Sequence, residues 1–292
     1  MSVLLGKFNL KSNNMKKIFY ILSAALSIGC CSAPVEQTAE IQVIGHRGGR
    51  YEVDENTLSA FVESYNNGVR AYETDLRLTA DNELVITHDA SLKRTFGVDV
   101  DTEKLTRAEL AQYKSLKGNP VLFVDELAKF FSDKEILYVE WEMKSNNYTP
   151  EQLKLYCDKL YNTVMPLKPE GALYIFSSFD ERAILTMLEL HPDAECMYIT
   201  AKPVCDEVLA KLAELGVRRV GCTIHATSRD AMKKAHEAGI IVNLWPGKCV
   251  EDFQLAYALG ADIACSDVPV AVLNFAKENM KWIKTSKDLT LK

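Results

Sequence analysis

The chain has 292 residues, of which 48% are apolar, and this length allows one large domain or two small ones. Acidic residues outnumber basic ones by 40 to 34, giving a formal net charge of −6. This balance argues against a nucleic-acid backbone as the main partner, because such partners are bound by basic surfaces, but it allows a small phosphodiester at a local cationic site.

Residues 1–40 are expected to form an export segment followed by a tether. From Met15 the sequence reads MKKIFYILSAALSIGC, with two lysines ahead of an apolar stretch too short for an ordinary transmembrane helix. Its last residues resemble a slightly degenerate bacterial lipobox, which makes Cys30 the lipidated first residue of an exported, membrane-anchored lipoprotein on the periplasmic or cell-surface face. An ordinary cleaved signal peptide is the simpler alternative. Residues 32–40 then form a flexible tether.

The first expected strand, residues 41–45, leads directly into the sequence Gly45-His46-Arg47-Gly48. Nine residues after His46 comes Glu55-Asn56-Thr57, just ahead of a helical pattern over 58–66. We expect Glu55 to orient Arg47 or its loop. Alternatively, it is only a favourable charge at the start of this helix.

The second expected strand, residues 71–76, carries Glu73 and Asp75. Side chains at i and i+2 share one face of a strand, so both carboxylates can point at one cation. Hard divalent ions such as Mg²⁺ and Ca²⁺ prefer these oxygen ligands. A shorter extended run over 83–87 ends at His88-Asp89, and the polar, weakly patterned residues 90–120 are expected to pass over the end of the sheet where barrel active sites lie.

The third expected strand, residues 137–143, places Glu140, Glu142 and Lys144 on one face. Charges inside a sheet are costly unless they are paired or bound to a metal. An edge strand with a solvated face is the alternative. Glu140 lies deeper in the strand, and we expect it to be the buried partner of a cation rather than a ligand.

The remaining sequence continues to alternate strand and helix patterns, which is typical of a parallel sheet covered by helices. The further strands are expected at 173–177, 195–199, 218–222, 240–245 and 262–265. Eight strands predict an α/β fold, a TIM (β/α)8 barrel over residues 41–275, with a small insertion after strand 2 and a C-terminal tail over 276–292. A doubly wound open sheet is the alternative.

The series HRG, ENT, ExD and T-x-D-x-x-L-V-x-x-H-D, in this order, resembles the glycerophosphodiester phosphodiesterases, which are metal-dependent hydrolases with a TIM barrel. Two positions depart from the family pattern: Asp54 stands where proline usually precedes ENT, and Asn82 follows Asp81 where glycine is usual. The resemblance implies one Mg²⁺ or Ca²⁺ held by Glu73, Asp75 and Glu142, the last through the family's E-x-K motif.

The resemblance also implies roles for the other polar residues. His46 and His88 are the expected general acid and base, since imidazoles with a pKa of about 6.5 can do both jobs near neutrality; alone, either would more often be structural. Arg47 and Lys144 are expected to bind the phosphate oxygens. Trp245, at the end of strand 7, is expected to form a pocket wall, with plain barrel packing as the alternative.

Three functions are consistent with these residues. The first is metal-dependent hydrolysis of glycerophosphodiesters to glycerol 3-phosphate and an alcohol. The second is the same chemistry on lysophospholipids, a phospholipase D-type activity, which a long apolar channel beside Trp245 would favour. The third is a non-catalytic, surface-anchored binding lipoprotein, which the loss of a histidine or a ligand would have favoured. Residues 246–248 read Pro-Gly-Lys where the family often has Thr-Val-Asn, so the shape of the alcohol pocket stays open.

Overall fold

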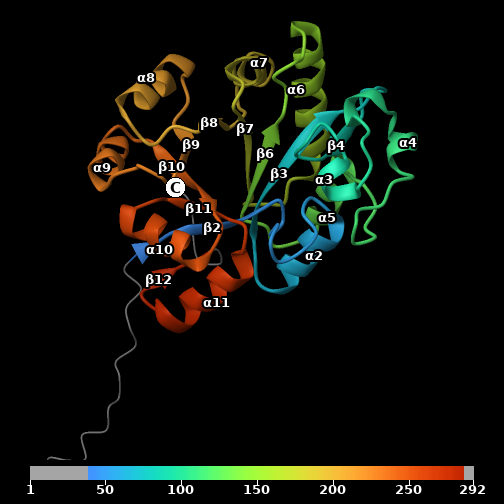
Figure 1. Cartoon of the computed structure of the whole chain (residues 1–292). Helices are drawn as coiled ribbons and strands as arrows, with labels where there is room; N and C mark the ends of the chain where they lie inside the picture. Colours follow the sequence, from blue (N-terminus) through green and yellow to red (C-terminus); the bar gives the residue numbers. More distant parts are fainter. Residues whose placement is uncertain (1–38, 286–292) are drawn as a thin grey trace, which may run out of the picture. The chain divides into compact units, whose positions relative to one another are not determined.

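A computed structural model describes residues 39–285 (Figure 1). The predicted export segment with Cys30, and the last seven residues of the tail, lie outside the described residues. Within residues 39–285, no helix is long and apolar enough to cross a membrane.

Eight parallel strands form a closed barrel (Figure 1). They are β2 (Gln42–His46), β3 (Ala71–Leu78), β6 (Tyr138–Met143), β7 (Leu173–Ser178), β8 (Cys196–Ile199), β9 (Arg219–Thr223), β10 (Ile241–Gly247) and β11 (Ile263–Ser266). Each strand pairs with the next in this order, and β2 pairs with both β3 and β11. The predicted TIM barrel is confirmed, and the pairing that closes the ring excludes an open doubly wound sheet.

Helices connect the strands and surround the barrel (Figure 1). They are α2 (Leu58–Asn66), α5 (Val124–Phe131), α6 (Pro150–Val164), α7 (Glu181–Leu190), α8 (Asp206–Leu215), α9 (Arg229–Glu237), α10 (Val250–Leu259) and α11 (Pro269–Asn279), with a 3₁₀ turn at Met165–Leu167 after α6. Thr57 begins α2 by accepting the Ala60 N–H, as N-cap threonines do. The boundary expected at residue 275 falls inside α11.

The insertion after strand 2 forms a small structure of its own. Its strands are β4 (Leu84–Ile86), antiparallel to β3, and β5 (Leu122–Phe123), antiparallel to β4. Between them lie the short helices α3 (Lys93–Phe96) and α4 (Arg107–Leu110) and a 3₁₀ turn at Thr102–Lys104. A separate apolar cluster that includes Leu92 and Leu110 packs them together. The extended run predicted ahead of His88 is confirmed as β4.

Strand alternation determines which residues of β6 point into the barrel. Val139 and Trp141 belong to the core between the barrel and the helices, whereas Tyr138 belongs to the small cluster inside the barrel. Because alternate residues face opposite sides, Glu140 and Glu142 share the inner face with Tyr138. Both side chains are buried, although they carry carboxyl groups. The barrel therefore holds acidic side chains in its interior.

The two ends of the described chain pair with each other. β1 (Ala39–Glu40) is parallel to β12 (Ile283–Lys284), and Ile283 is buried in the outer core. At these positions the structure has short strands where a flexible tether and a polar tail were expected. Strands of two residues are too short to show a sequence pattern, and their pairing joins segments that are far apart in the chain.

Candidate active site

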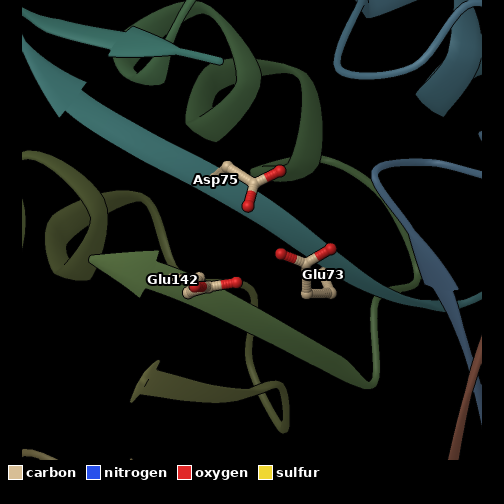
Figure 2. A group of neighbouring side chains, drawn as sticks. All are labelled: Glu73, Asp75 and Glu142. Atoms are coloured by element: carbon tan, nitrogen blue, oxygen red, sulfur yellow. The ribbon is translucent and has the colours of Figure 1, made fainter. Parts of the chain in front are cut away.

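Three buried carboxylates converge at the end of the barrel where β3 and β6 lie side by side (Figure 2). Glu73 and Asp75 come from β3, and Glu142 comes from β6, where it is paired in register with Asp75. One oxygen atom of each carboxylate lies within 4.8 Å of the others. The sequence places them there because all three occupy inward-facing strand positions.

These carboxylates have different electrostatic environments. Burial, together with the nearby Asp75 and Glu142, raises the pKa of Glu73 well above its ordinary value. Burial also acts to raise the pKa of Asp75, but the attraction of Lys144 and Arg47 outweighs it and holds that pKa well below its usual range. Lys144 bridges the cluster, because its Nζ lies 3.0 Å from Asp75 Oδ1 and also donates to Glu142 Oε1.

The three carboxylates fit a hard divalent cation. Glu73 Oε1 is buried and has no hydrogen-bond partner among the described residues, which is costly for a polar atom. A cation within reach of all three residues would satisfy this atom and offset the mutual repulsion. An all-carboxylate donor set suits Mg²⁺ or Ca²⁺ better than zinc, which favours nitrogen and sulfur ligands.

His46 ends β2 and is oriented by a carboxylate from the far end of the chain. Its Nδ1 donates to Asp267, which is fully buried just after β11. This bond leaves Nε2 free to accept a proton, 3.7 Å from Glu73 Oε2. Burial lowers the pKa of His46 despite the hydrogen bond to Asp267. Sequence reasoning missed this role of Asp267, for which the available signal was the D-x-P at residues 267–269, similar to the end of the family pattern.

His88 follows β4 and is oriented in a similar way by its own neighbour. Its Nδ1 lies 2.6 Å from Asp89 Oδ1, so that Nε2 is again the free nitrogen. Burial is the largest influence on this imidazole and lowers the pKa of His88. Burial thus favours the neutral form of each ring, in which Nε2 can accept a proton, and the ring that acts as the general acid must first take one up.

Seven of the eight predicted site residues line one pocket of about 340 Å³: His46, Arg47, Glu73, His88, Glu142, Lys144 and Trp245. Asp75, the eighth, lies fully buried beside them. Trp245 packs edge-on against Phe179, with ring centroids 5.8 Å apart, and the two rings form an aromatic wall. His225, by contrast, is exposed and does not line this pocket.

Glu140 corrects one expectation. Its carboxyl accepts hydrogen bonds from Ser177 Oγ at 3.1 Å and Asn243 Nδ2 at 3.0 Å, rather than pairing with a cation. Burial and the neighbouring Glu142 raise the pKa of Glu140 to about 8, so it is protonated near neutrality. A neutral acid can be buried among neutral donors at much lower cost than a carboxylate.

The backbone and side chain of Arg47 are both fixed. The residue has a positive φ of 53°, and its peptide N–H donates to Glu73 Oε2 at 3.0 Å. Its guanidinium lies 2.9 Å from Glu55 Oε1 and 3.1 Å from Asp75 Oδ2. The expectation that Glu55 orients Arg47 is confirmed. Gly48, which follows with φ 81°, allows the close approach to α2, since a Cβ there would lie 3.0 Å from Ala60 Cβ.

The insertion is tied to this loop by charged contacts that the sequence did not predict. Arg94 of α3 donates to Asp89 Oδ2 at 2.6 Å and to both oxygens of Glu55 at 2.7 and 2.8 Å. Asp54, which stands in place of the usual proline, accepts from Ser115 and from Asn119 Nδ2 at 2.8 Å. The carboxylates that orient His88 and Arg47 are therefore held by one guanidinium.

We expect Arg94→Met to lower kcat by about ten- to a hundredfold, because small displacements of reacting groups are costly. The readout is kcat and KM measured separately, together with the pH profile of kcat, which a merely structural change would not shift. Arg94→Lys should restore only part of kcat, since lysine cannot bridge two carboxylates with a planar fork. Lys93→Met, on the same helix and exposed, is the control. An unchanged kcat in Arg94→Met would contradict the positioning role.

Comparison with known proteins places the chain in a family. The sequence profile of the Glycerophosphoryl diester phosphodiesterase family matches residues 46–271, which is most of the chain. The chain belongs to this family. A relative with high coverage is a glycerophosphodiester phosphodiesterase of Caldanaerobacter subterraneus, 23% identical over 247 residues, which cover 81% of this chain and 98% of the relative.

Other family members match over shorter stretches or in fold. A lysophospholipase D of Rattus norvegicus is 43% identical over 70 residues, but the match spans only 24% of this chain and 22% of that relative. Two solved structures resemble this one at 22% sequence identity. The first is an Oleispira antarctica phosphodiesterase in complex with the product sn-glycerol-3-phosphate, with a TM-score of 0.74 over 81% of this chain and 96% of that chain. The second is a Parabacteroides distasonis glycerophosphodiester phosphodiesterase, with a TM-score of 0.69 over 82% of this chain and 98% of that chain. At this identity they support the family's fold.

Proposed function

We propose that the protein hydrolyses glycerophosphodiesters to glycerol 3-phosphate and an alcohol, with one divalent cation, Mg²⁺ or Ca²⁺, held by Glu73, Asp75 and Glu142. One observation carries this proposal: two imidazoles, each oriented by a carboxylate, line the same pocket as the carboxylate cluster. The family match supports the substrate class, and the size of the pocket supports a small ligand.

The chemistry is divided between binding and proton transfer. When bound, the cation neutralises phosphate oxygens and stabilises the charge that builds up in the transition state. Arg47 and Lys144 line the pocket beside the cluster and orient the phosphate by donating to its oxygens. Their own carboxylate partners hold both side chains in place before the substrate arrives.

His46 and His88 move the protons. One imidazole Nε2 accepts the proton of the attacking hydroxyl, either water or the glycerol hydroxyl of the substrate, as the new P–O bond forms. The other ring, in its protonated form, gives its proton to the departing alkoxide as the old P–O bond breaks. If the glycerol hydroxyl attacks, the product is a cyclic phosphate, which water then opens with the proton transfers reversed.

Lysophospholipids are the second candidate substrate, because the lysophospholipase D of Rattus norvegicus shares 43% identity over 70 residues. The pocket argues against them. Its volume of about 340 Å³ is at the lower end for small-molecule sites and leaves little room for an acyl chain. A non-catalytic binding protein is disfavoured because both histidines and all three carboxylates are present at the pocket.

The test is release of glycerol 3-phosphate from a panel of glycerophosphodiesters, with and without EDTA and with Mg²⁺ or Ca²⁺ added back. We expect release that EDTA abolishes and one of the cations restores, while circular dichroism shows an unchanged fold. Release that is insensitive to EDTA would contradict the metal site. Release of choline from lysophosphatidylcholine, with none from the panel, would replace the proposed substrate by the lipid alternative.

A further inference from the structure

Two cationic side chains, Arg50 and Lys248, line the pocket on the side of β10, β11 and β2. We propose that they bind an anionic group on the alcohol part of the substrate. The enzyme then prefers glycerophosphodiesters whose alcohol is negatively charged over those with a neutral or cationic alcohol. This inference rests on the proposed function, because it concerns the part of the same substrate that leaves as the alcohol.

The backbone next to each cation is hydrogen-bonded to the backbone of Asp267. The Tyr51 N–H donates to the Asp267 carbonyl at 3.0 Å, and the Asp267 N–H donates to the Gly247 carbonyl at 2.7 Å. Gly247 is required for the second contact, since a Cβ there would lie 2.6 Å from the Cys265 carbonyl oxygen. Lys248 follows this glycine directly, so its backbone position is determined by the packing of β10 on β11.

In the part of the chain that the structure describes, Lys248 has no carboxylate partner, and Arg50 has only long contacts with carboxylates that it shares with other groups. Arg50 Nε has no hydrogen-bond partner there, and its nearest carboxylates, Glu55 at 3.8 Å and Asp267 at 4.0 Å, already bind other groups. The Lys248 ammonium has no carboxylate within 4.0 Å among the same residues. Asp252 accepts a hydrogen bond only from the Lys248 peptide N–H, at 2.8 Å.

The two phosphate-binding cations differ from this pair. Arg47 and Lys144 are each paired with two carboxylates, so most of their charge is offset within the protein. Lys248 has no such partner among the described residues. Arg50 lies over the Tyr51 ring, 4.9 Å from its centroid, and reaches its nearest carboxylates only at 3.8 and 4.0 Å, so part of its charge remains for a ligand that enters the pocket.

The topology separates Lys248 from the reacting phosphate. β10, which leads to Lys248, lies four strands from β6 in the ring of eight and is therefore opposite Glu142. Trp245 on β10 and Phe179, which directly follows β7 next to β6, contact each other and line the pocket. A diester bound at the carboxylate cluster can thus extend its alcohol along the aromatic wall toward Lys248. A choline or ethanolamine cation in that place would meet the like charge of Lys248.

The first experiment compares kcat/KM for glycerophosphoinositol 4-phosphate and glycerophosphoinositol, which differ only by a phosphomonoester on the alcohol. We expect the anionic substrate to be favoured by roughly tenfold, the size of a modest ion-pair contribution, mainly through KM. The preference should shrink as the ionic strength rises, because partly exposed charges are screened. Equal kcat/KM values, or a preference that is independent of salt, would overturn the inference.

Variants assign the effect to the side chain. Lys248→Met keeps the apolar stem and removes the charge, so the preference should fall, and Lys248→Arg should restore it. Lys233→Met, an exposed lysine on α9, is the matched control and should keep the wild-type ratio. A ratio that is the same in Lys248→Met and in the wild type would contradict the assignment.

Binding distinguishes this inference from the proposed function. Calorimetric titration of the cation-loaded His88→Ala variant with the same two compounds measures the preference without turnover. Tighter binding of the phosphorylated compound, lost on adding Lys248→Met, supports the anionic subsite even if neither compound is hydrolysed by the wild type, in which case only the proposed function fails. Hydrolysis of both compounds with equal binding would instead refute the subsite and leave the proposed function standing.

Discussion

His88→Ala is expected to slow turnover by about 10²–10⁴-fold, the usual contribution of a general acid or base. The imidazole lines the pocket, and its Nε2 is left free by the bond from Nδ1 to Asp89. The side chain is 35% exposed and belongs to none of the apolar clusters of residues 39–285, so its removal should leave the fold intact. His88 is a cleaner target than His46, whose ring also contacts Glu73.

The measurement is kcat with cation binding followed in parallel by thermal shift. The unfolding temperature and its rise with added cation should match the wild type, while kcat falls. His225→Ala is the matched control, because it removes an exposed histidine outside the pocket. Near-normal kcat in His88→Ala would exclude a role in proton transfer.

A substrate with a p-nitrophenolate leaving group assigns the role. This anion leaves without needing a proton, so a variant lacking the general acid regains much of its rate with it. If His88 is the acid, His88→Ala should lose far less rate on the p-nitrophenyl ester than on an alkyl diester, and His46→Ala should be equally slow on both. The reverse pattern would assign the acid to His46 and the base to His88.

The barrel strands and the shared face of Glu73 and Asp75 were predictable because both depend on local periodicity, whereas the choice of Glu142 as the third ligand came from the family resemblance. Alternation within β3 and β6 places Glu73, Asp75 and Glu142 on the inner face, whatever the rest of the chain does. The strand and helix patterns between residues 41 and 266 are regular for the same reason. The face on which each of these side chains lies needed only its neighbours in the sequence, but the pairing of β3 with β6 that brings Glu142 to Asp75 needed the barrel.

The contacts that orient the histidines were not predictable in this way. Asp267 meets His46 across 221 positions, and only closure of the barrel brings β11 beside β2. Arg94 lies in a weakly patterned insertion whose path no periodicity defines. Glu140 was expected to pair with a cation, but its partners Ser177 and Asn243 come from β7 and β10, and a single strand cannot show what faces it.

Glu73→Gln is expected to abolish the cation-induced rise in unfolding temperature and to reduce turnover to near background. Removing a residue that only hydrogen-bonds to a metal ligand typically weakens metal binding by roughly 10–100-fold, and removing a ligand itself should weaken it more. In the wild type, a cation at a hundred times its Kd should stabilise the fold by about 2.7 kcal/mol. Thermal unfolding with and without Mg²⁺ or Ca²⁺ measures this difference directly, and Glu63→Gln, exposed on α2, is the control.

The metal-free proteins make the assignment specific. Glu73 is buried beside Asp75 and Glu142, so its neutral amide analogue removes repulsion, and the amide oxygen can still accept the Arg47 N–H. Without cation, Glu73→Gln should therefore be at least as stable as the wild type. Asp75→Asn should instead be destabilised, by about 3–5 kcal/mol if it behaves as a broken buried pair, because Arg47 and Lys144 lose a shared partner. Glu73→Gln and Asp75→Asn each remove one negative charge from the cluster. They should have different effects on the stability of the metal-free protein, but both should weaken cation binding. A cation-induced shift that survives in Glu73→Gln, with normal turnover, would place the cation elsewhere.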